Sequence, residues 1–148
     1  MSTEQAVAIE STFDHINLNT VDPAGMKIPV GVPINFVVTE AAKKTYSNER
    51  GSGAYVSFKF TVVDSPEFSG RSFYKSLFED KEGGKNATAR QLRILMDATG
   101  IQQSGEFADW LTELVTQKAT FSAPLEDRTD KTGKVKTEPN MWRVSPAN

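Results

Sequence analysis

The sequence GSGAYVSFKFTVVD, which spans Gly51–Asp64, alternates between apolar and polar residues along most of its length. Such a period of two predicts a half-buried β-strand with one dry and one wet face. The dry face comprises Val56, Phe58, Phe60 and Val62. The wet face carries Tyr55 and Lys59, which lie four residues apart on the same side. This face is either an ordinary solvated surface or a platform for a flat, anionic ligand.

The segments on both sides of this strand extend the pattern to three strands. Before it, residues 33–46 alternate in the same way and become polar at Lys43 and Lys44. The turn-rich loop SNERGSG, which contains Arg50, joins the two strands. After it, the tight turn SPEFSG leads into a third strand over residues 71–79.

Both faces of the third strand are bulky, so periodicity does not decide which one points outward. One face comprises Arg71, Phe73, Lys75 and Leu77, and the other comprises Tyr74 and Phe78. If Phe73 and Leu77 belong to the core, Tyr74 faces the solvent, and this is the favoured assignment. With the opposite assignment, Arg71 and Lys75 face the solvent instead.

Two helices are predicted after the third strand. The first begins near Asn86 or Thr88, either of which is a suitable cap, and ends at Gly100. The second covers residues 105–116. Its apolar stripe comprises Phe107, Trp110, Leu111, Leu114 and Val115.

The chain then returns to β-structure. A fourth strand alternates through Ala119, Phe121 and Ala123, and TDKTG forms a hairpin turn with Gly133. The sequence KVKTEPNMWRV predicts a fifth strand, which Pro139 confines to an edge. The fold class is therefore mainly β (α+β). The order favours a five-stranded OB-fold-like Greek-key barrel with helices inserted between strands three and four.

Composition narrows the class of protein further. A chain of 148 residues and 16.3 kDa suits one domain, here residues 33–148, preceded by an arm or early strands over residues 1–32. The net charge of -2 argues against a strongly basic DNA-coating protein but permits a locally basic groove.

The absence of cysteine excludes disulfides and thiolate metal sites. A lone His15 and the lack of a Walker-type loop predict no enzymatic activity and no cofactor. The sequence also shows no signal-peptide pattern and no apolar run that predicts a membrane partner.

The stretch GAYVSFKFTVVDSPEFSGRSFYKSLF resembles a group of small bacteriophage proteins encoded near recombination and replication genes. Their pattern is a basic strand, a glycine-bearing loop, a tyrosine-led alternating strand, a short acidic turn and Gly-Arg before the next strand. The matching positions are Lys43, Lys44, Gly53, Tyr55, Phe58, Gly70 and Arg71. The helix ARQLRILMDATG and the segment DKTGKVKTEPNMW also fit, so that the likeness covers residues 13–142. One departure is the ending WRVSPAN, where many such proteins carry an acidic tail that recruits replication partners.

This resemblance implies an OB-fold single-stranded DNA-binding protein that acts in phage replication or recombination, in the cytoplasm of the infected host. The expected partners are single-stranded DNA and, with it, replication or recombination proteins; a homodimer is compatible with this interpretation. Such binding needs aromatic rings for bases and cations for phosphates. The candidate residues are Lys43, Lys44, Tyr46, Arg50, Tyr55, Lys59, Arg71, Tyr74, Lys75, Lys134 and Trp142.

A second hypothesis is a protein-interaction module. The same small barrel would serve as an adaptor or inhibitor of a host factor and would bind through the acidic helix face GEFADWLTELV. The net negative charge mildly favours this alternative.

Overall fold

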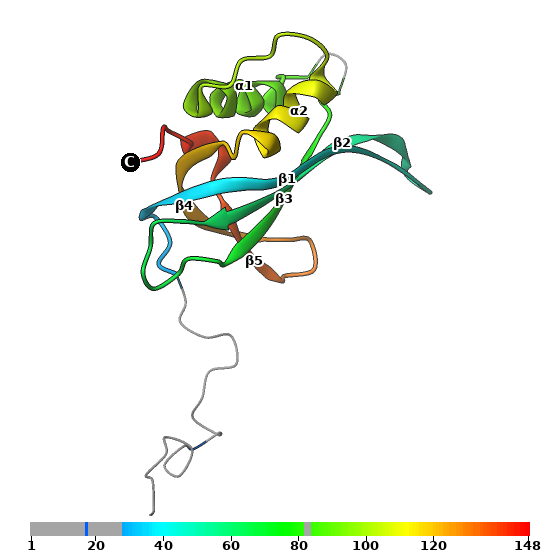
Figure 1. Ribbon diagram of the computed structural model, residues 1–148. Coiled ribbons are helices and arrows are strands. Elements are labelled where there is room, and N and C mark those ends of the chain that lie inside the picture. The colour runs from blue at the N-terminus through cyan, green and yellow to red at the C-terminus, as the bar shows by residue number, and fades with distance from the viewer. Residues whose placement is uncertain (1–16, 18–27, 82–83) are drawn as a thin grey trace, which may run out of the picture.

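The computed structural model describes residues 17, 28–81 and 84–148. It is mainly β, with an open five-stranded antiparallel sheet and two α-helices (Figure 1). The strands are β1 (Pro33–Asn48), β2 (Gly51–Val62), β3 (Ser72–Phe78), β4 (Thr120–Thr129) and β5 (Val135–Pro139). The helices are α1 (Ala87–Thr99) and α2 (Phe107–Thr116), and a 3-10 turn, η3 (Met141–Arg143), follows β5.

The predicted order of three strands, two helices and two strands is confirmed. The predicted N-terminal arm, residues 1–32, lies outside the described residues apart from Asn17 and residues 28–32.

Strand β1 is the centre of the sheet, whose order is β3-β2-β1-β4-β5. Phe36 on β1 lies opposite Val62 of β2 on one side and opposite Phe121 of β4 on the other. A register shift between Val38 and Glu40 interrupts the pairing with β2. Beyond it, the hairpin formed by β1 and β2 extends past the rest of the sheet as a two-stranded arm (Figure 1).

The core lies between the sheet and the two helices, which cover the same side of the sheet (Figure 1). The alternation predicted for β2 is confirmed, because all four residues of its dry face are buried. Phe121 stacks on Phe36 at 5.5 Å between ring centroids and meets the edge of Phe60 at 4.9 Å. The helices contribute Leu95, Trp110, Leu111 and Leu114. Each such apolar side chain contributes roughly 1.5–3 kcal/mol on burial.

The structure resolves the two possible orientations of β3. Phe73, Lys75 and Leu77 point inward, whereas Tyr74 and Phe78 are exposed. The favoured assignment is thus confirmed for the aromatic residues.

The end of the chain differs from the prediction. The fifth strand ends at Pro139, and Trp142 lies on η3 instead of on a strand. Asn140 produces this turn, because its side-chain oxygen accepts a hydrogen bond from the Trp142 N–H. Strand β4 does not alternate either: residues 121–125 are all buried. The C-terminal segment pairs with the edge of β4 that faces away from β1 at this point, where Ser122 and Ser145 exchange backbone hydrogen bonds.

Candidate nucleic-acid interface

Three aromatic rings meet on the outer face of the sheet, the face opposite the helices. In the antiparallel register Tyr55 lies opposite Phe78, and Tyr46 lies opposite Gly53. The Tyr55 and Phe78 rings stack with centroids 5.2 Å apart and planes inclined by 29°. Tyr46 meets the Phe78 ring edge-on at 5.6 Å and the Tyr55 ring at 6.4 Å. Tyr46, Tyr55 and Phe78 form what is called here the aromatic cluster.

Gly53 makes room for this cluster. A Cβ atom at this position would lie 2.8 Å from the Tyr46 hydroxyl oxygen and 3.0 Å from ring carbons of the same side chain. A side chain there would therefore push the Tyr46 ring away from Tyr55. Gly53, which lies on β2 in the structure, thus supports the aromatic cluster by leaving space for the Tyr46 ring.

The rings of this face are open to solvent to different degrees. Tyr74 is 57% exposed, Phe78 53% and Tyr46 37%, whereas Tyr55 is half-buried beneath its neighbours. Apolar surface that stays exposed in this way is available for contact with a flat ligand. A shallow hollow of about 500 Å³ lies beside the rings. It is lined by Tyr46, Asn48, Arg50, Tyr55, Ser76 and Phe78.

Cations surround the aromatic cluster, and acids partly balance them. Lys44 lies opposite Tyr55 on the neighbouring strand and therefore shares its face. The Lys59 ammonium lies 5.8 Å from the centre of the Tyr74 ring and 3.7 Å from a Glu40 carboxylate oxygen. Arg50 lines the hollow at the tip of the hairpin. Glu49 precedes Arg50 in the chain, so acids accompany two of these three cations.

Lys43 and Lys44, predicted as a basic pair, lie on opposite faces of the sheet. Lys43 lies opposite Val56, a core residue, and Lys44 opposite Tyr55. Successive residues of a strand point to opposite sides of the sheet. Lys43 is accordingly exposed on the side of the helices, and only Lys44 lies beside the aromatic cluster.

Lys75 is a clear correction to the predicted site. Its side chain is buried, and its ammonium group pairs with the buried carboxylate of Glu138 on β5. Burial lowers the pKa of Lys75, and the nearby Arg128 guanidinium lowers it further. The Arg128 side chain lies 3.8 Å from the same carboxylate. Lys75 therefore links the two end strands of the open sheet and is absent from the outer face.

Arg71 and Trp142 also lie apart from the aromatic cluster. Arg71 stacks over the Phe68 ring at 5.8 Å, and its carbonyl oxygen accepts a hydrogen bond from the Val62 N–H. This places Arg71 at the end of β2 opposite to Tyr55. Trp142 lies on η3, an element that contacts α1 and β4.

Lys134 lies on the ordered hairpin between β4 and β5. The Asp130 carboxylate accepts hydrogen bonds from the Thr132 hydroxyl and from the N–H groups of Thr132 and Lys134. These hydrogen bonds lower the pKa of Asp130, and the one from the Thr132 hydroxyl has the largest effect on it. Figure 1 shows this hairpin and the β1–β2 hairpin extending to the same side of the sheet in that view. Lys134 is exposed on this hairpin.

The most central residue of the site, Phe78, is missing from the predicted set. The signal was present, because Phe78 is four residues from Tyr74 on the same face of a strand. Its role depends on the register that places it opposite Tyr55, and this register cannot be derived from the periodicity of one strand.

The sequence matches no known protein-family model, and no curated protein shows significant similarity to it. Within residues 17, 28–81 and 84–148, no cluster of three or more His, Asp or Glu side chains is arranged to hold a metal ion. In that same part of the chain, no helix has the length and apolarity needed to span a membrane.

Proposed function

We propose that the protein is a sequence-tolerant single-stranded DNA-binding protein that acts in phage DNA replication or recombination. The observation that carries this proposal is the aromatic cluster, which is exposed on a sheet face together with Tyr74 and with the cations Lys44, Arg50 and Lys59. Exposed rings and nearby cations are the two ingredients of single-strand binding. The expected site of action is the cytoplasm of the infected bacterium.

The physical basis of binding would be stacking supplemented by limited phosphate neutralisation. Each base–ring contact is worth about 1–3 kcal/mol, and any base can make it because every base has a π face. The electrostatic part is smaller, since Glu40 and Glu49 offset part of the positive charge. If all three cations contact phosphates, the slope of log K against log salt is about -2, from about -0.7 per phosphate on single strands.

The fold proposed for this function is an OB-fold. In its support, β1 pairs on both sides, β3 and β5 are the end strands of the sheet, and the helices lie between β3 and β4 in the chain. A partly open five-stranded barrel binds oligonucleotides on its second and third strands. These are the strands that carry Tyr55, Tyr74 and Phe78.

A titration of a fluorescein-labelled thymidine oligomer at several salt concentrations tests this proposal, with a duplex of the same length as control. We expect binding to the single strand that weakens as salt rises, and much weaker binding to the duplex. Equal binding to both would contradict the aromatic mechanism, because the bases of a duplex are not available for stacking on side chains. No binding to either would favour the alternative of a protein-interaction module.

A further inference from the structure

The rings of the outer face lie at two positions along β3. The aromatic cluster occupies the first position, where Phe78 lies opposite Tyr55. Tyr74 occupies the second, opposite Lys59, whose ammonium group lies 5.8 Å from the centre of the Tyr74 ring. Tyr74 and Phe78 are both exposed, and they point to the same side of the strand. A ligand that follows β3 therefore meets two open rings in succession.

Small side chains separate the two ring positions. Between them, Ser57 of β2 lies opposite Ser76 of β3. Ser76 is exposed and also lines the shallow hollow beside the aromatic cluster. On the far side of Tyr74, the next opposed pair is Thr61 and Ser72, whose hydroxyl oxygens lie 3.0 Å apart. The outer face of β2 and β3 thus alternates between a ring, two small serines, a second ring and two hydroxyl groups.

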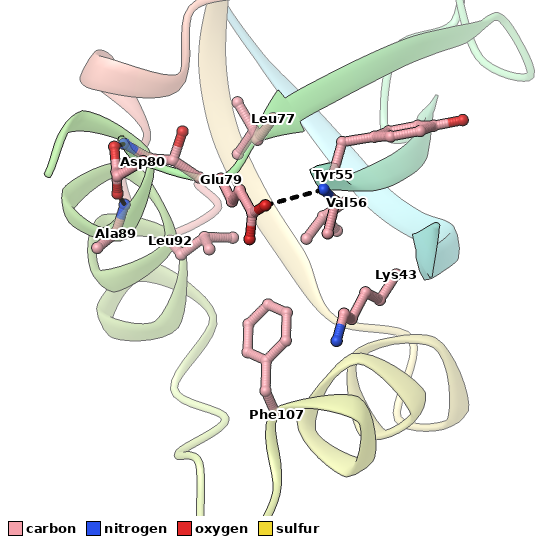
Figure 2. A pocket seen from close by; sticks show the side chains of 11 residues that line it. Lys43, Tyr55, Val56, Leu77, Glu79, Asp80, Ala89, Leu92 and Phe107 are labelled. Carbon is pink, nitrogen blue, oxygen red and sulfur yellow. Dashed lines mark hydrogen bonds between the residues drawn. The ribbon is translucent and has the colours of Figure 1, made fainter. Parts of the chain in front are cut away.

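The other side of the same strands does not continue this row of rings. Figure 2 shows that the Tyr55 ring points away from a hollow of about 250 Å³ between the sheet and the helices. The described residues that line this hollow include the carboxylates of Glu79 and Asp80 against one cation, Lys43. A chain of phosphates is therefore better accommodated on the outer face.

The distance between the two ring positions determines which bases of a strand can reach them together. At about 3.3 Å per residue of a strand, Tyr74 and Phe78 lie about 13 Å apart along β3. A nucleic-acid strand advances about 3.4 Å per nucleotide when its bases stack on each other, and about twice as far when it is extended. A base that stacks on a side-chain ring is separated from its neighbouring base, so the extended spacing applies. The distance of about 13 Å then corresponds to two nucleotide steps.

We propose that the outer face binds two bases separated by one nucleotide, the first on the aromatic cluster and the second on Tyr74. The base between them lies over Ser57 and Ser76. The ion pair of Lys59 with Glu40 is partly exposed and therefore weak, so that Lys59 is able to contact a phosphate beside Tyr74 instead. This inference rests on the proposed function, because it specifies how the same face holds a single strand.

The test uses eight-nucleotide DNA oligomers that each carry two thymines, with abasic nucleotides at all other positions. The thymines are adjacent or separated by one, two or three abasic nucleotides, so that all oligomers have the same charge and the same number of bases. Fluorescence titration at low salt measures their affinities, with an unmodified thymidine octamer as reference. We expect the tightest binding when one abasic nucleotide separates the thymines. It should exceed the binding of adjacent thymines at least about fivefold, the lower limit for one additional stacking contact.

Two substitutions on the exposed side of β3 assign this preference to particular residues. Tyr74→Ala should remove the preference, because only one ring position remains. Ser76→Tyr places a ring between the two positions and should raise the affinity for adjacent thymines to that of the separated ones, a gain that a folding defect would not produce. Trp142→Ala removes an exposed ring on η3 and is the matched control, which should keep the preference unchanged.

The outcomes separate this inference from the proposed function. If the unmodified octamer does not bind, both fail together. If it binds, but adjacent thymines bind as tightly as those separated by one abasic nucleotide, only the spacing is overturned. Tightest binding with two or three abasic nucleotides between the thymines also overturns the spacing alone. A preference that persists in Tyr74→Ala does so as well, because the second base then lies on another residue.

Discussion

At the scale of single residues, Phe78 and Tyr55 have different roles although their rings are stacked. Tyr55 is half-buried and supports the aromatic cluster, whereas the Phe78 ring offers more than half of its surface to solvent. The Phe78 side chain is not part of the core, which lies on the other side of β3. A large apolar side chain that stays exposed in this way is better explained by contact with a ligand than by a contribution to folding.

Phe78→Ala should weaken binding of a thymidine oligomer by about 1–3 kcal/mol, which is about 5- to 150-fold. The salt dependence should stay the same, because no charge is removed. Trp142→Ala is the matched control, since this ring is 49% exposed but lies on η3, which contacts α1. The measurement is a fluorescence titration at fixed salt with each variant. Equal losses for the two variants would contradict the location of the site.

Lys44→Gln should reduce the slope of log K against log salt by about 0.7, the value for one phosphate contact on a single strand. Lys43→Gln should not alter this slope, because Lys43 lies on the opposite side of the same strand. Both side chains are exposed, so neither substitution should disturb the fold. A reduced slope in both variants would show that the oligomer contacts both sides of the hairpin.

The limits of prediction at this scale have a physical reason. Alternation placed Tyr55 and Lys59 on an outer face because the other side of β2 is uniformly apolar. The same argument did not determine which side of β3 faces inward. Lys75 is acceptable inside only because Glu138 supplies a partner from a strand 63 positions further along the chain. Such a long-range pair leaves no trace in the local sequence pattern.

At the scale of elements, helix α1 shows how a predicted boundary can be correct while its cause is different. The helix begins after Asn86 and ends at Gly100, as predicted. Asn86, however, adopts a left-handed conformation and makes no capping hydrogen bond with its side chain. Asp80, at the end of β3, accepts the hydrogen bonds of Thr88 and Ala89 instead. Its charge also suits the N-terminus of the helix.

Asp80→Ala should therefore lower the free energy of unfolding by about 1–2 kcal/mol, a typical cost of losing a helix cap. Asn86→Gly serves as the comparison and should change stability by less than about 0.5 kcal/mol, because glycine adopts the left-handed conformation readily. Urea denaturation followed by circular dichroism measures both. A greater loss in Asn86→Gly than in Asp80→Ala would refute the assignment of the cap to Asp80.

At the scale of the whole molecule, the sequence predicted the order of strands and helices. It did not determine how far the sheet closes into a barrel. Residues 33–46, 54–64 and 71–79 were predicted as strands, the first two because apolar residues alternate there. The two helices were predicted because their apolar stripes have the helical period. Closure depends on how β3 and β5 approach one another, and among the described residues no backbone pairing between them accompanies the Lys75–Glu138 ion pair. Neither residue was distinguishable from a surface charge in the sequence.

This ion pair gives the last prediction, since it joins the two ends of the open sheet. Lys75→Met should destabilise the protein by about 3–5 kcal/mol, because it leaves the Glu138 carboxylate buried without its main partner. The double variant Lys75→Met/Glu138→Leu should recover most of this loss, because well-packed apolar residues often replace a buried ion pair at little cost. Urea denaturation of the two single variants and the double variant measures the coupling.

Arg128 lies 3.8 Å from Glu138 and is itself largely exposed, so Arg128→Ala should have a smaller effect than Lys75→Met. If the double variant is as unstable as the sum of the single variants, the pair does not act as a unit, and β3 and β5 must be held together by the surrounding apolar core alone.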